Sequence, residues 1–216
     1  PDANQAEKFI LTLDPYIGAI KVGLELFIKT GRTFSDLTQK SIILDLKLHD
    51  IPETVARAVK SGGDLGVKFM TLHAQQKKTL EMAAKAAEPF GITLLMVTVL
   101  TSMTEQDYHD LDLNPNSSIL GRVGRLAKLG SEAGIRGFVC SPHEVKSLKR
   151  ILPEAFYLLP GVRSVGAAVG DQKRVGTPAQ AIHDGANLVV IGRQVRDALD
   201  PQAEMKSIAE EIGADI

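Results

Sequence analysis

Short apolar runs alternate along the chain with segments in which apolar residues recur every three or four positions. The runs are almost continuously apolar, whereas a strand with one solvated face alternates apolar and polar residues. This pattern predicts parallel strands that are covered on both faces. The predicted strands are residues 19–24, 42–48, 68–73, 93–100, 137–140, 157–159 and 188–191.

Segments with helical periodicity lie between these strands, for example residues 52–60, 77–87, 118–133 and 177–184. Regular alternation of strand and helix predicts βαβ units with right-handed crossovers. No linker, low-complexity tract or repeat of fixed period divides the chain. We therefore expect a single α/β domain over residues 1–216.

The number of strands decides between two architectures. Seven strands are predicted, and the chain opens at Pro1 with a helix-like segment, residues 2–13, that no predicted strand precedes. Eight strands close a barrel, whereas seven leave a gap lined by unpaired backbone. We expect a (β/α)8 TIM barrel whose first strand is absent from the sequence. An open, doubly wound sheet is the alternative.

Composition and charge narrow the class of partner. The chain is 44% hydrophobic with a formal net charge of −1, and no run of Lys or Arg makes a basic face. Nucleic acid is therefore a poor candidate for the main partner. The longest apolar run, residues 94–100, is too short to cross a bilayer, and no signal peptide is visible. We expect a cytoplasmic protein with no membrane partner.

Charged residues interrupt the second predicted strand. Asp45 and Lys47 share one face of it, because strand side chains alternate, and Asp50 follows in the loop. Lys21 occupies a matching position on the preceding strand, so the four groups could form a network of alternating sign. A purely structural ion pair fits the pattern of Asp45 and Lys47 equally well. The second carboxylate favours an active site, since like charges about 4 Å apart repel by about 4 kcal/mol at an effective dielectric near 20.

Two later segments suggest where an anion binds. Gly192 and Arg193 end the last predicted strand and precede a short helical stretch, residues 194–199. In barrels, the loops after the final strands commonly bind phosphate. The long, glycine-punctuated segment 160–178 is either a flexible loop or a closing lid. We identify no partner for His73 and interpret it as a structural residue. We interpret His49 likewise, because its position faces away from Asp45 and Lys47.

The stretch from Asp45 to Pro52 resembles the signature of the orotidylate decarboxylase family, and Lys21-Val22-Gly23 is similar to the family's preceding strand. The resemblance extends over essentially the whole chain. It includes the motifs Thr98-Val99-Leu100-Thr101-Ser102, Pro160-Gly161-Val162-Arg163, Gly170-Asp171-Gln172 and Ile191-Gly192-Arg193. The family's fold is a TIM barrel. Its members end the first strand with an aspartate that holds the ribose hydroxyls, and no residue here fills that role.

The resemblance implies a cofactor-free decarboxylation of orotidine 5′-monophosphate to UMP, with no metal. Lys47 would protonate C6, Asp45 and Asp50 would hold Lys47, and Lys21 would orient the ribose and Asp45. The implied enzyme is a homodimer in which Asp50, Ile51 and Thr54 reach the neighbour's site. The implied substrate-binding residues are Ile51, Thr54, Thr101, Ser102, Pro160, Arg163, Gln172, Gly192 and Arg193.

Within this assignment, Thr101 would bind the pyrimidine edge with help from Ser102, and Gln172 would bridge the phosphate and the pyrimidine. Arg163 would lie nearby as a further contact, and Gly192 and Arg193 would bind the phosphate.

Two other functions stay open. Related barrel enzymes, such as hexulose-phosphate synthases and keto-gulonate-phosphate decarboxylases, share the Asp-x-Lys-x-x-Asp pattern but use Mg²⁺, and they carry a glutamate where this chain has Lys21. A non-catalytic barrel that only binds a nucleotide is the second alternative.

Overall fold

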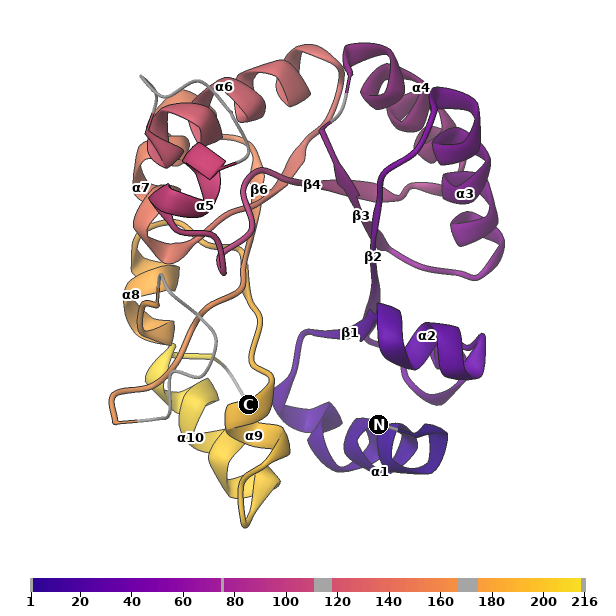
Figure 1. The fold of residues 1–216 in the computed structure, drawn as a ribbon. Helices are drawn as coiled ribbons and strands as arrows, with labels where there is room; N and C mark the ends of the chain where they lie inside the picture. The colour runs from indigo at the N-terminus through magenta and orange to yellow at the C-terminus, as the bar shows by residue number, and fades with distance from the viewer. Residues whose placement is uncertain (1, 75, 111–117, 167–174, 215–216) are drawn as a thin grey trace.

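The computed structural model describes residues 2–74, 76–110, 118–166 and 175–214. Its strands form one parallel sheet of seven, in which each strand pairs with the next along the chain (Figure 1). The strands are β1 (Ala19–Gly23), β2 (Ser41–Leu48), β3 (Phe69–His73), β4 (Thr93–Val97), β5 (Gly137–Val139), β6 (Phe156–Leu159) and β7 (Leu188–Val189).

Helices lie on the outside of this curled sheet (Figure 1). The longer α-helices are α1 (Ala3–Leu13), α3 (Pro52–Asp64), α4 (Lys77–Ala87), α6 (Ile119–Glu132), α7 (Pro142–Ile151) and α10 (Pro201–Glu211). The shorter helices are α2 (Leu24–Thr30), α5 (Glu105–Asp110), α8 (Pro178–His183), α9 (Arg193–Arg196), η1 (Asp14–Tyr16), η2 (Ser35–Leu37) and η3 (Glu88–Phe90). Among the described residues, no helix combines the length and the apolar character that crossing a membrane requires.

The almost continuous apolar character of the strands is explained by two cores, one on each face of the sheet. Leu44, Met70 and Met96 belong to the large outer core, which the helices cover. The alternate positions face inward and form a second apolar cluster, made of Ile43, Phe69, Leu95, Val97, Val139 and Leu158. The polar residues at the strand ends, described below, lie on the same inner face as this apolar cluster.

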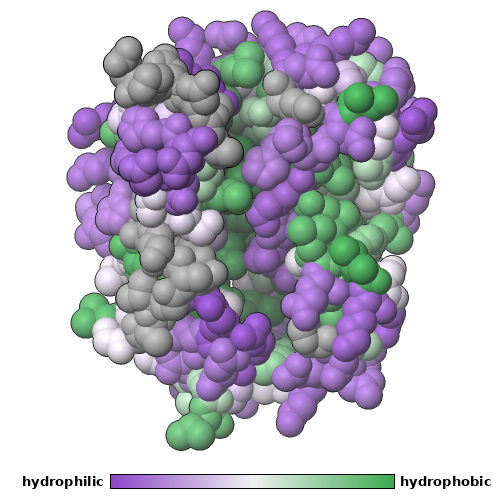
Figure 2. Space-filling view, viewed as in Figure 1, coloured by the Kyte–Doolittle hydropathy of each residue, from purple (hydrophilic) through white to green (hydrophobic). Residues whose placement is uncertain are grey.

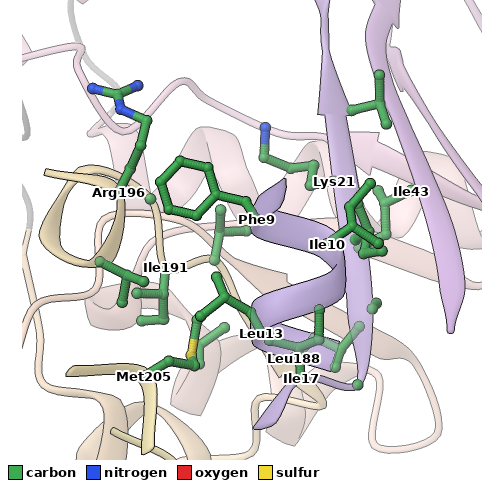
Figure 3. Close-up of a pocket in the computed structure, with 18 of the residues that line it drawn as sticks. Phe9, Ile10, Leu13, Ile17, Lys21, Ile43, Leu188, Ile191, Arg196 and Met205 are labelled. Atoms are coloured by element: carbon green, nitrogen blue, oxygen red, sulfur yellow. The ribbon is translucent and has the colours of Figure 1, made fainter. Parts of the chain in front are cut away.

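The sheet curls like a barrel but is open between its first and last strands. The strand order is sequential, with no reversal, which rules out the doubly wound alternative. A cavity of about 600 Å³ lies between β1 and β7 and is lined mostly by apolar side chains of α1, β1, β7 and α10. Figure 3 shows Leu13, Leu188 and Met205 in this cavity, with Lys21 and Arg196 toward one end of it. The architecture is the predicted (β/α)8 barrel with one strand position open.

Several predicted elements are longer or placed differently than the observed ones. The strand predicted over 93–100 ends at Val97, because the chain turns there, and both the main-chain N–H and the hydroxyl of Thr98 bond to the carbonyl of Val139. The strand predicted over 188–191 has two residues in β7, which pairs with β6. The short helix predicted over 194–199 is α9, which starts at Arg193 with Gly192 as its N-cap.

Candidate active site

A cluster of charged side chains lies on the inner face of β1 and β2. The ammonium of Lys47 is 2.8 Å from Oδ1 of Asp45, and the ammonium of Lys21 is 2.8 Å from Oδ2. Gly23 of β1 is in register with Asp45, which brings Lys21 beside it from the neighbouring strand. The structure therefore joins three of the four groups expected in the network, and one carboxylate bridges two cations.

Burial and charge act in opposite directions on Asp45. Its residue is 8% exposed. Burial alone would raise the pKa of the carboxyl, but the adjacent Lys21 and Lys47 outweigh it and lower the pKa to about 2. Asp45 is therefore a carboxylate at neutral pH. Two ammonium groups against this one carboxylate leave the cluster with a positive charge that an anionic ligand could neutralise.

The two lysines remain accessible from outside. Their side chains are 29% and 32% exposed, while the Asp45 side chain is 10% exposed. Figure 2 shows the face of the molecule seen in Figure 1 hollowed near its centre, with hydrophilic residues along one side of the hollow and hydrophobic residues in its depth. The cluster therefore combines a buried anchor with two cations that can reach a ligand.

Asp50 does not join the cluster within this chain. Its side chain is exposed and accepts a hydrogen bond from the main-chain N–H of Ile51 at 2.7 Å, and no ion pair links it to Lys47 among the described residues. Ile51 is 61% exposed, and Thr54 is half-buried in the first turn of α3. Asp50 and Ile51 are thus exposed at the start of α3, where Thr54 is half-buried.

Two arginines form a second positively charged group. Arg163 is 8% exposed, donates from Nη1 to the carbonyl of Val162 at 2.6 Å, and leaves its buried Nε without an acceptor in the described part of the chain. Burial lowers the pKa of Arg163, and the charge of nearby Arg193 lowers it further. Arg193 is exposed and begins α9 after Gly192. Cations this close, with a donor still unused, are suited to a multiply charged anion.

The remaining predicted site residues are at strand ends or outside the described residues. Thr101 is buried and Ser102 exposed in the turn after β4, and half-buried Pro160 directly follows β6. Gln172 lies outside the described residues, as does much of the predicted lid. The ends of that segment come together where Val162 bridges Gly176.

Two polar residues of β3 were not identified as site residues from the sequence. Thr71 is 1% exposed and donates a hydrogen bond to Oδ1 of Asp45 at 2.9 Å. His73, for which no partner could be identified from the sequence, has its ring centroid 5.6 Å from that of His49. Strand alternation could have identified both residues, because it places Thr71 and His73 on the inner face together with Phe69.

Comparison with known proteins shows the family of this chain. The model of the Orotidine 5′-phosphate decarboxylase / HUMPS family matches residues 1–208. The chain is 44% identical over 213 residues to the orotidine 5′-phosphate decarboxylase of Mannheimia succiniciproducens, covering 95% of this chain and 90% of that protein. It is 45% identical over 212 residues to the corresponding protein of Actinobacillus pleuropneumoniae, covering 94% of this chain and 91% of the relative.

A solved structure gives the same result at the level of the fold. The crystal structure of orotidine 5′-phosphate decarboxylase from Lactobacillus acidophilus superimposes with a TM-score of 0.82 and 34% sequence identity, covering 99% of this chain and 95% of the other. The family model, the sequence relatives and the fold all agree. This chain belongs to the Orotidine 5′-phosphate decarboxylase / HUMPS family.

Proposed function

We propose that this chain decarboxylates orotidine 5′-monophosphate to UMP and CO₂, as a cytoplasmic enzyme of pyrimidine biosynthesis. The observation that carries the proposal is the bridged cluster in which Asp45 binds both Lys47 and Lys21 at 2.8 Å. The names of relatives that are 44% and 45% identical over most of the chain support the same substrate. A cation at Lys21, where Mg²⁺-dependent relatives carry a glutamate, favours this reaction over a metal-dependent sugar-phosphate lyase.

In the proposed reaction the bond between C6 and the carboxylate breaks, CO₂ leaves, and the electron pair stays on C6. The ammonium of Lys47 stabilises this charge and transfers a proton to C6, and the amine regains its proton from solvent. Fixed charges on an apolar floor act strongly on a developing charge because they need not reorient as it forms. No cofactor enters this scheme.

Asp45 has two roles in the proposal. It holds the Lys47 ammonium in place, and its own negative charge lies close to where the substrate carboxylate would bind, which disfavours the ground state. The low pKa of Asp45, about 2, keeps this charge present at neutral pH. Lys21 holds the other carboxylate oxygen and orients the ribose.

The phosphate of the substrate would bind at Arg163, Gly192 and Arg193. The unused Nε of Arg163 and the proximity of its charge to Arg193 support this assignment. We further assign Thr101, Ser102 and Pro160 to the pyrimidine, and Gln172 to a bridge between the pyrimidine and the phosphate. Phosphate binding would close the segment 160–178 and help to assemble the charge cluster.

We also propose a homodimer in which Asp50, Ile51 and Thr54 complete the site of the partner. Within its own chain Asp50 makes no contact with Lys47 among the described residues, so its carboxylate is available to another site. Ile51 is 61% exposed, and Leu24 and Ile28 of α2 are 48% and 78% exposed. Leu24 and Ile28 are four residues apart on α2 and so share one face of it, and exposed apolar side chains that lie together favour a protein interface.

The direct test is to incubate the purified protein with orotidine 5′-monophosphate and follow the ultraviolet change to UMP, with and without EDTA. We expect turnover that EDTA does not affect. Lys47→Ala should lower kcat by at least about 10³-fold, within the range for loss of a general acid. Lys60→Ala, an exposed lysine of α3, is the matched control and should keep wild-type kcat.

Full activity of Lys47→Ala would refute the assignment of the proton donor. EDTA-sensitive cleavage of a sugar phosphate, with no release of UMP, would instead support the Mg²⁺-dependent alternative. Binding of the nucleotide without any turnover would support the non-catalytic one.

A further inference from the structure

Thr71 makes two hydrogen bonds to the charge cluster through one oxygen. Its Oγ1 donates to Oδ1 of Asp45 at 2.9 Å and accepts the main-chain N–H of Lys47 at 2.8 Å. A hydroxyl has one proton and two lone pairs, so both bonds form at the same time. With 1% of the residue exposed, water has little access to replace either bond.

The main chain at Lys47 needs such an acceptor because the ladder between β2 and β3 is interrupted there. Leu44 is in register with Met70, but Leu48 is in register with Leu72, so Thr71 alone faces the residues between Leu44 and Leu48. Lys47 takes a φ of 51°, in the left-handed region that residues with a Cβ rarely adopt. A side-chain oxygen thus replaces the strand carbonyl that a regular ladder would supply.

This arrangement connects the backbone of Lys47 with its side chain. Oδ1 of Asp45 receives both the hydroxyl of Thr71 and the ammonium of Lys47. The Thr71 hydroxyl therefore bonds to the Asp45 carboxylate, which holds the Lys47 ammonium. It also bonds to the main chain of Lys47, from which that ammonium extends. Removal of the hydroxyl loosens both ends of the lysine together.

We propose that Thr71 is a positioning residue for Lys47, which holds the left-handed turn and the Asp45 carboxylate so that the Lys47 ammonium stays at the reacting carbon. This inference rests on the proposed function for its catalytic half. Its structural half depends only on the bonds of the Thr71 hydroxyl.

The kinetic test compares Thr71→Val, which keeps the shape but loses the hydroxyl, with Thr71→Ser, which keeps it. Thr71→Val should lower kcat by about tenfold to a hundredfold, the range for losing one hydrogen bond to a charged group, with KM changed by less than about threefold. Thr71→Ser should recover most of kcat. If Thr71→Val does not fold, Thr71→Ala removes the hydroxyl without adding a methyl group.

The matched control is Thr98→Val. Thr98 is similarly buried, at 6% exposed, and its hydroxyl bonds to the carbonyl of Val139 rather than to the cluster. It should cost stability but leave kcat near the wild-type value. A wild-type kcat in Thr71→Val, or an equal loss in Thr98→Val, would overturn the proposal.

A second measurement does not depend on catalysis. Hydrogen exchange of the Lys47 amide should be at least about tenfold faster in Thr71→Val than in wild type, because the bond that protects it is lost, and Thr71→Ser should restore protection. If the wild type fails to convert orotidine 5′-monophosphate, the proposed function fails, and this measurement still decides the role of Thr71. Unchanged exchange in Thr71→Val would overturn it.

Discussion

The ammonium of Lys47 lies 2.8 Å from Oδ1 of Asp45, an ion pair between two residues that are two positions apart on the same strand. The pair is partly enclosed above an apolar floor, where charges are screened less than at the surface. Removing either partner would leave the charge of the remaining one poorly compensated. The stability of the fold therefore depends on whether Asp45 is ionised.

Replacement of Asp45 by Asn should destabilise the protein in a pH-dependent way. The pKa of Asp45 is lowered from 3.8 to about 2 in the folded chain, so its charge stabilises the fold above pH 4, and this contribution is lost as pH falls toward 2. The lost contribution is about 2 kcal/mol. Urea unfolding of wild type and Asp45→Asn between pH 2 and pH 5 measures it. A difference in unfolding free energy that stays constant over this range would contradict the shift.

Most of the fold can be predicted from the sequence because a strand that is buried on both faces is apolar at almost every position. Ile43, Phe69 and Leu95 face inward while their neighbours face the helices, and a continuous apolar run is the only pattern that serves both cores. Alternation also predicted that Asp45 and Lys47 share a face. The two side chains do meet, at 2.8 Å, although the register of β2 against β3 shifts between Leu44 and Leu48.

The local backbone geometry where the register changes could not be predicted from the sequence. The shift between Leu44 and Leu48 and the left-handed backbone of Lys47 are tertiary features, and the main chain there bonds to Thr71 on another strand. Alternation placed His49 away from Asp45 and Lys47, but it could not predict that its ring lies 5.6 Å from that of His73. The position of Asp50, in a loop beyond the strand, likewise cannot be derived from strand periodicity.

The ring of His73 should report the charge of the cluster. Its pKa is lowered by burial first, then by His49 and Lys47, while Asp45 raises it. The pKa of His73 should therefore rise in Lys47→Ala and fall in Asp45→Asn. NMR titration of the ring protons measures both changes. Movement in the same direction in the two variants would contradict the arrangement of charges.

Inorganic phosphate should stabilise the protein through the two arginines. At a concentration ten times its Kd, an anion that binds only the folded state adds about 1.4 kcal/mol to the unfolding free energy. Arg193→Ala should abolish this gain, since it removes the exposed guanidinium beside Arg163. Arg136→Ala, an exposed arginine that bonds to the carbonyl of Ser131, is the control and should retain the gain. Thermal unfolding in phosphate and in chloride at equal ionic strength measures it. An equal gain in Arg193→Ala would place the anion elsewhere.

Two glycines of α6 should respond in opposite directions to the same substitution. A Cβ on Gly124 would have its nearest neighbour, Cδ1 of Ile151, at 3.9 Å, so Gly124→Ala should stabilise the helix by up to about 1 kcal/mol. A Cβ on Gly130 would lie 2.8 Å from Sδ of Met96 and 3.0 Å from Cε1 of Phe138. Both of those side chains are fully buried, so a Cβ there would force the packed core to shift. Overpacking of this kind costs about 1–3 kcal/mol, which exceeds the gain in helix propensity, so Gly130→Ala should destabilise the protein. Chemical denaturation of the two variants measures the difference, and equal effects would show that α6 does not pack against β4 and β5 as closely as described.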